Sequence, residues 1–89
     1  MKAVLTVIGK DKVGIIAAVS GILSENGVNI LDISQTIMRG MFTMIMLVDL
    51  QDNGDNMALL SEKLNGLEKD MGLSIHIQNE EVFNSMHRI

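Results

Sequence analysis

Cysteine and proline are both missing from this 89-residue chain, and only two residues are aromatic, Phe42 and Phe83. Without cysteine there is no disulfide framework, no thiol nucleophile and no thiolate metal site. With so few rings, the core has to be built from aliphatic side chains and from the eight methionines, which pack adaptably. We therefore expect one domain with an aliphatic core. Its stability should be modest, and association with a partner chain would increase it.

Two further absences restrict the partners. No apolar run reaches the roughly 20 residues that a membrane-spanning helix needs, and the chain opens on strand-like alternation rather than on a leader sequence. Lysine and arginine number 7 against 11 aspartates and glutamates, with no basic block, so the formal charge of −4 argues against a nucleic-acid surface. These features predict a cytoplasmic protein that binds neither membranes nor nucleic acid.

The hydrophobic pattern predicts four strands and two helices in the order β-α-β-β-α-β. Strands are expected at residues 2–9, 28–39, 41–50 and 73–78, and helices at residues 13–26 and from Asp55 or Asn56 to residue 71. Asp11 stands at the N-cap position of the first helix, and Gly27 and Gly72 follow the ends of the two helices. The tail, residues 79–89, can form a short helix only if it docks.

Strand composition predicts the order of the sheet. The strands at 2–9 and 41–50 are apolar on both faces and are expected in the middle. The other two belong at the edges because they carry polar residues on one face, namely Asp32, Ser34, Thr36, Ser74, His76 and Gln78. Right-handed crossovers then place both helices on one face of a four-stranded antiparallel sheet. The predicted fold is α+β, a ferredoxin-like βαββαβ sandwich, in a single domain spanning residues 1–89.

This fold hosts many functions, so residue types have to discriminate among them. An RNA-binding version needs aromatic rings on the central strands, a soft-metal carrier needs paired cysteines, and an acyl-phosphate hydrolase needs an arginine beside the first turn. The central strands carry a single ring, Phe42, the chain has no cysteine, and the turn carries two lysines and an aspartate instead of an arginine. Neither His76 nor His87 stands in a nucleophile–base pattern. We predict no catalytic residue, no metal site and no cofactor, and hence a binding protein rather than an enzyme.

One segment has the chemistry of a binding site, the turn Gly9-Lys10-Asp11-Lys12-Val13-Gly14. It leads from a buried strand into a helix N-terminus, whose unpaired N–H groups and partial positive charge favour a carboxylate. Lys10 and Lys12 add positive charge, and Gly14 lets another molecule approach closely. A purely structural alternative stays open, in which the turn is only a capped one and Gly14 lets the helix pack on the sheet.

Residues 9–30 (GKDKVGIIAAVSGILSENGVNI) and 31–36 (LDISQT) closely resemble the ACT domain, a regulatory amino-acid-binding module of enzymes of amino-acid metabolism. The resemblance extends over essentially the whole chain and is strongest to the small UPF0237 proteins. The chain is also similar to the ACT domains of the glycine-cleavage repressor and of formyltetrahydrofolate deformylase. Val13 stands where many ACT domains have proline before the turn glycine.

The resemblance implies a homodimer or larger oligomer that binds an amino acid or similar small metabolite where two domains meet. It assigns the ligand contacts to Asp11, Lys12, Val13, Gly14, Ile15, Asn29 and Ile30. The alternative is a protein–protein adaptor, a regulatory subunit that docks an enzyme or regulator and has no ligand of its own. Stabilisation by an amino acid favours the first hypothesis, and a stoichiometric native partner favours the second.

Overall fold

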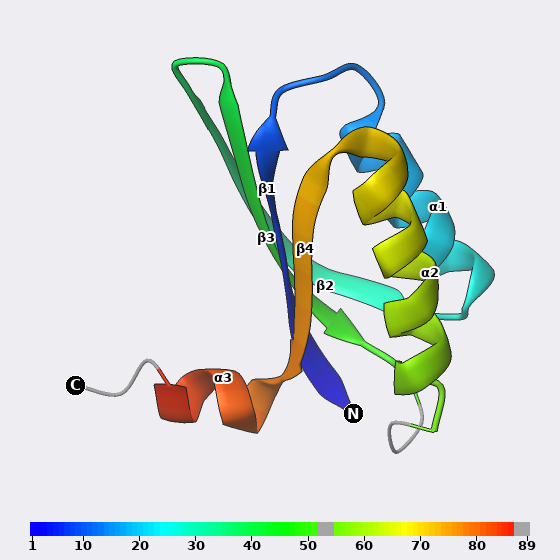
Figure 1. Cartoon of the computed structure of the whole chain (residues 1–89). Coiled ribbons are helices and arrows are strands. Elements are labelled where there is room, and N and C mark those ends of the chain that lie inside the picture. The colour runs from blue at the N-terminus through cyan, green and yellow to red at the C-terminus, as the bar shows by residue number, and fades with distance from the viewer. Residues whose placement is uncertain (52–54, 87–89) are drawn as a thin grey trace.

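Four antiparallel strands and two long helices follow one another in the predicted order, and a short third helix comes last (Figure 1). The computed structural model describes residues 1–51 and 55–86. The elements are β1 (Lys2–Lys10), α1 (Ile15–Glu25), β2 (Asn29–Met38), β3 (Met41–Asp49), α2 (Met57–Met71), β4 (Leu73–Asn79) and α3 (Glu80–Met86). The α+β fold class and the βαββαβ order are therefore confirmed.

The strand order in the sheet is β2-β3-β1-β4, with every pair antiparallel. The two doubly apolar strands are thus in the middle and the half-polar ones at the edges, as predicted. The β2–β3 hairpin turns at Arg39 and Gly40, which both have positive φ. A shift of register between Ile30 and Asp32 leaves Leu31 without a partner on β3 and bends the start of β2.

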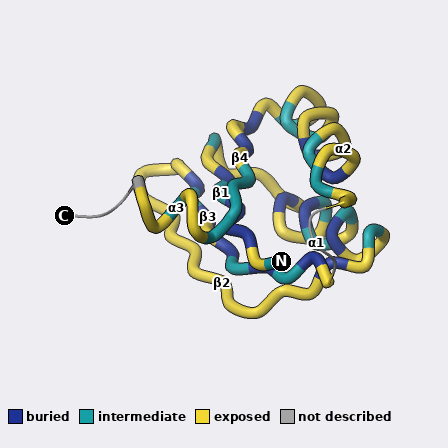
Figure 2. The backbone as a smooth tube through the Cα atoms, turned by 90° about the horizontal axis from the view of Figure 1, so that it is seen from below, coloured by how far each residue is buried: buried dark blue, intermediate teal, exposed yellow. Residues whose placement is uncertain are grey.

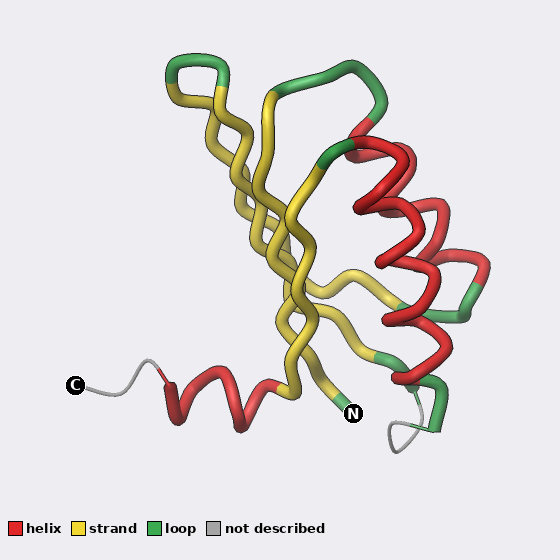
Figure 3. Tube along the Cα trace, viewed as in Figure 1, coloured by secondary structure: helices red, strands yellow, loops and turns green. Residues whose placement is uncertain are grey.

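The core lies between the sheet and the two long helices, which cover the same face (Figure 3). Alternate residues of the central strands point into it, because side chains along a strand alternate between its faces. The buried strand residues include Leu5, Val7, Met44, Met46 and Val48, and the buried helix residues are Ile15, Val19, Leu23, Leu60 and Leu64. Burial of each such side chain stabilises the fold by about 1.5–3 kcal/mol.

The tail docks, but on the other side of the sheet. Helix α3 lies across from α1 and α2 and contacts β1 and β4 (Figures 1 and 3). Phe83 is half-buried, whereas Val82 is exposed, so only part of the apolar surface of α3 is covered. The side chain of Met86 and residues 87–89, with His87, lie outside the described residues.

Strand β2 is exposed along its whole length (Figure 2). Ile30, Ile33 and Ile37 are 36, 43 and 57% exposed. Their partners on β3 are Val48, Met46 and Phe42, which are buried in the core, so the three isoleucines lie on the helix-facing side of the sheet. The two long helices therefore stop short of covering β2. An edge strand with apolar side chains left uncovered is typical of a surface through which chains associate.

Candidate ligand-binding turn

The turn between β1 and α1 ends on Gly14, which has a left-handed backbone with φ of 91° and occupies the N-cap position of α1. Apart from its chain neighbours, no described residue would have an atom within 4 Å of a methyl group added at Gly14. Glycine is therefore favoured here by the backbone conformation and not by close packing of the helix on the sheet. The alternative in which Gly14 serves only that packing is wrong.

Helix α1 begins without a side-chain cap, and its first turn contains no acidic residue. The prediction that Asp11 is the N-cap is therefore wrong. The left-handed Gly14 moves the start of the helix to Ile15, and the N–H of Asp11 donates instead to the carbonyl oxygen of Gly40, at 2.8 Å. The first N–H groups of any α-helix have no intrahelical acceptor, so those of α1 are left for water or a ligand.

The other turn residues predicted to contact a ligand, Lys12, Val13 and Ile15, differ from one another in exposure and in contacts. The Nζ of Lys12 donates to the carbonyl oxygen of Met71 at 2.6 Å, so its charge lies at the negative end of α2 rather than over α1. Val13 is fully exposed, at 100%. The side chain of Ile15 is buried in the core. At Ile15 only the backbone N–H can serve a ligand.

A hollow of about 460 Å³ opens beside this turn. Its walls include Asp11, Lys12 and Gly14 from the turn, the first residues of α1, and Gln35, Ile37 and Phe42 from the β2–β3 hairpin. Gln35 and Ile37 were not predicted as site residues. The sequence predicts that both residues lie on a strand. That they border the turn follows only from the structure, in which the helices leave β2 uncovered. The hollow has room for a small metabolite with one apolar and one charged end.

Asn29 and Ile30 lie elsewhere. They line a second hollow, of about 450 Å³, together with Ser24, Gly27 and Gln51. Strand β2 has 10 residues, so at about 3.3 Å per residue its two ends lie roughly 30 Å apart. Within one chain, the predicted site residues therefore form two groups rather than one site.

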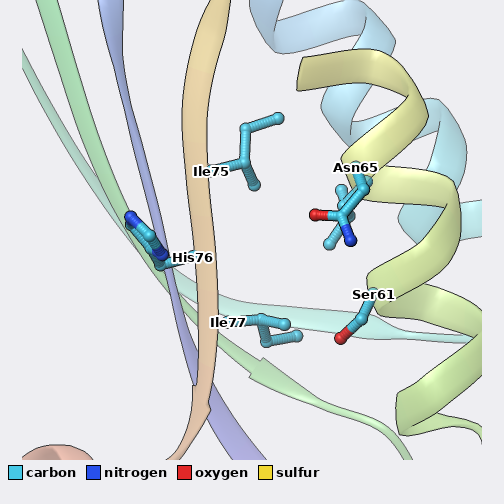
Figure 4. A pocket seen from close by; sticks show the side chains of 6 residues that line it. Ser61, Asn65, Ile75, His76 and Ile77 are labelled. Carbon is cyan, nitrogen blue, oxygen red and sulfur yellow. The ribbon is translucent and has the colours of Figure 1, made fainter. Parts of the chain in front are cut away.

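A smaller hollow, of about 200 Å³, lies between α2 and β4 (Figure 4). Ile75 and Ile77 point toward α2, and His76 points to the opposite side of the sheet (Figure 4). The Nε2 of His76 is 3.3 Å from the hydroxyl of Ser74, its neighbour on that face. His76 is thus an exposed sheet-face residue, as its place in the strand pattern indicated.

Two features are absent from residues 1–51 and 55–86, the part of the chain that the structure describes. No three His, Cys, Asp or Glu side chains gather there in a way that could hold a metal ion. No helix in that part of the chain is long and apolar enough to cross a bilayer.

The comparisons with known proteins agree with this architecture. The family model of the ACT domain matches residues 2–78. A UPF0237 protein from Clostridium perfringens is 57% identical over 89 residues, which is 100% of both chains. A UPF0237 protein from Methanocaldococcus jannaschii is 46% identical, over 99% of this chain and 98% of its own.

Solved structures show the same likeness. An ACT domain protein from Streptococcus pneumoniae is 41% identical, with a TM-score of 0.81 over 93% of each chain. A putative glycine cleavage system transcriptional repressor is 25% identical, with a TM-score of 0.77 over 86% of this chain and 44% of its own. A formyltetrahydrofolate deformylase from Burkholderia mallei, 15% identical with a TM-score of 0.78 over 88% of this chain and 28% of its own, shares the fold.

The βαββαβ fold, the 2-3-1-4 sheet and the family match define an ACT domain, a regulatory domain whose members generally bind small molecules and oligomerise. Within that class, the chain belongs to the UPF0237 family, since its full-length relatives align with it from end to end.

Proposed function

We propose that two copies of this chain associate through β2 and bind a small metabolite, an amino acid in the first instance, at the junction. The first turn of one copy and the start of β2 of the other would form each site. The observation that carries the proposal is the position of the first-turn hollow. It reaches the uncovered edge of the sheet, where Gln35 and Ile37 form its rim.

Antiparallel pairing explains why the candidate residues form two groups. When two β2 edges pair about a two-fold axis, the start of one strand lies beside the end of the other. Asn29 and Ile30 of the second copy then come close to Gln35 and Ile37 of the first. The pairing brings together the two groups, which in a single chain lie toward opposite ends of β2. It also covers the exposed isoleucines of β2.

The walls of the first-turn hollow match the three parts of an amino acid. The uncapped N–H groups of α1 suit a carboxylate. The carboxylate of Asp11, on the same hollow, offers an acceptor for an ammonium group. Ile37 and Phe42 supply apolar surface for a small side chain. This combination supports a zwitterion over a simple anion.

Calorimetry and thermal-shift measurements with the amino acids at millimolar concentration test the ligand. We expect at least one amino acid to raise the melting temperature. Its analogue without the amino group should bind at least tenfold more weakly, because that analogue cannot form the charge-assisted hydrogen bond to Asp11, which is worth roughly 1.5–3 kcal/mol. No shift with any amino acid would contradict the ligand. A stable monomer in sedimentation would contradict the shared site.

The second candidate function is an adaptor role, a binding activity toward another protein. The face of the sheet opposite α1 and α2 favours it, because Ile8, Met41 and Ile45 are 40, 49 and 43% exposed there. Recovery of one regulator or enzyme at a fixed stoichiometry from the native cell, together with no amino-acid binding, would select this function over the first. Under either function the chain acts by binding and not by catalysis.

A further inference from the structure

Strand β4 is the edge of the sheet remote from β2, and its outward backbone groups can be identified. In an antiparallel pair, alternate residues turn their N–H and C=O groups toward the neighbouring strand and away from it. The N–H of Ile75 donates to Oε1 of Glu68 at 2.7 Å, so it is turned away from β1. Leu73 and Ile77, two residues to either side, share that orientation.

Glu68 reaches this edge from the C-terminal part of α2 and is half-buried there. Its carboxylate accepts from one of the four outward N–H groups of β4, those of Leu73, Ile75, Ile77 and Asn79. A hydrogen bond to a charged acceptor is about twice as strong as a neutral one, and an incoming strand would have to displace it. Displacement would also leave the carboxylate partly buried without its donor. The β4 edge is therefore occupied at Ile75, near the middle of the strand.

The β2 edge carries a weaker obstacle. The N–H of Ile33 donates to the carboxylate of Asp32 at 2.9 Å, which identifies Ile33, Gln35 and Ile37 as the outward residues of this strand. Asp32 is exposed and adjoins Ile33 in the chain, so rotation of one surface side chain frees that N–H. Among the described residues, no side chain accepts a hydrogen bond from the N–H of Gln35 or Ile37.

We infer that Glu68 closes the β4 edge against strand addition and thereby limits edge pairing to one partner per chain, at β2. The inference rests on the proposed β2 pairing. A chain with two open edges would add copies without limit, since each added copy exposes another edge. With β4 closed, the joined sheet of a dimer has closed edges at both ends and growth stops at two copies.

Sedimentation velocity of the full chain over a range of concentrations tests this inference. Glu68→Ala removes the acceptor, and we expect species larger than a dimer whose proportion grows with concentration. Glu68→Gln retains an oxygen that can accept from Ile75 and should leave a dimer. Glu62→Ala removes a carboxylate from an exposed position of the same helix and should also leave a dimer. In the double variant, Ile33→Lys blocks the β2 edge and Glu68→Ala opens the β4 edge. Each chain then has one open edge again, so we expect a dimer instead of the larger species.

A folded Glu68→Ala chain that stays a dimer at every concentration would overturn the inference. Should Glu68→Ala fail to fold, amide hydrogen exchange of the unaltered chain decides, because Ile75 must exchange more slowly than Ile77 and equal rates would contradict closure. A monomeric unaltered chain would contradict the proposed function instead. In that case a shift from monomer to dimer on Glu68→Ala would still support closure of β4.

Discussion

The ammonium of Lys12 donates to the carbonyl oxygen of Met71 at 2.6 Å and so joins the turn before α1 to the end of α2. On its other side, the same turn is held by the hydrogen bond from Asp11 N–H to the carbonyl oxygen of Gly40. The turn is therefore fixed between a helix end and a hairpin, while the N–H groups at the start of α1 carry no side-chain cap. A rigid turn with uncapped donors is suited to bind an anion without reorganising.

The first prediction concerns Lys12. Lys12→Ala should lower the free energy of unfolding by about 0.5–1 kcal/mol, because an exposed cation at a helix C-terminus contributes on that scale. Thermal denaturation measures the loss. Lys63→Ala, at an exposed position within α2, is the control and should leave the melting temperature almost unchanged. Equal effects of the two substitutions would show that the contact with Met71 contributes no stability.

The second prediction separates backbone strain from ligand binding. Gly14→Ala and Gly40→Ala each place a side chain at positive φ, with open space around the new methyl group, so each should cost roughly 1–2 kcal/mol of stability. Only Gly14→Ala puts that methyl beside the N–H groups of α1. We expect amino-acid affinity to fall at least tenfold for Gly14→Ala and to stay unchanged for Gly40→Ala, as measured by calorimetry. A similar fall in both variants would assign the effect to strain.

The third prediction concerns the surface between copies. Ile33→Lys replaces a 43% exposed residue on β2 and should convert the dimer to a folded monomer, because it puts a charge into the paired edge. Leu59→Lys makes the same change at a 47% exposed position of α2 and should leave the dimer intact. Light scattering at matched concentrations compares them. A dimeric Ile33→Lys chain would exclude β2 as the pairing edge.

The fourth prediction concerns Asp49. The Gln51 N–H bonded to its carboxylate at 2.9 Å, with help from the N-terminal ammonium 3.5 Å away, holds the pKa of Asp49 below its ordinary value. A carboxylate whose pKa is lowered by folding stabilises the fold above its unfolded pKa, and this contribution is lost as the pH falls below about 4 toward the folded pKa.

Asp49→Asn should therefore lower the free energy of unfolding at neutral pH, with a deficit that shrinks as the solution is acidified below about pH 4. Chemical denaturation at a series of pH values measures it. Asp70→Asn, the same charge change at an exposed position of α2, is the control. A deficit for Asp49→Asn that stays constant with pH would contradict a role for the ionised carboxylate.

Local patterns predicted the fold because each element carries its own signals. The doubly apolar strands β1 and β3 had to be central, and the helical stripes ending at Gly27 and Gly72 left few choices for α1 and α2. The bulge at Leu31 and the position of α3 on the opposite face depend on contacts between distant segments. No local spacing encodes them.

The candidate site was predicted from the sequence only as a set of residues. The turn was identified from its own chemistry and Asn29 through a family resemblance. The contact of Lys12 with Met71 joins residues far apart in the chain, and no pattern around Lys12 indicates it. Asp11 failed as an N-cap because the backbone of Gly14 starts the helix later. Gln35 and Ile37 were missed because their exposure depends on how far the helices extend over the sheet.

The central claim is that each site takes residues from two copies, and a mixture of two variants tests it most directly. Gly14→Ala and Asn29→Ala chains alone should each bind at least tenfold more weakly than the unaltered chain, so neither contributes sites of unaltered affinity. Unfolded, mixed in equal amounts and refolded, about half of the dimers should be hybrids that each contain one intact site, so about a quarter of the unaltered binding capacity should return at unaltered affinity. A mixture that regains no site of unaltered affinity, while the unaltered chain taken through the same refolding keeps its affinity, would contradict a shared site.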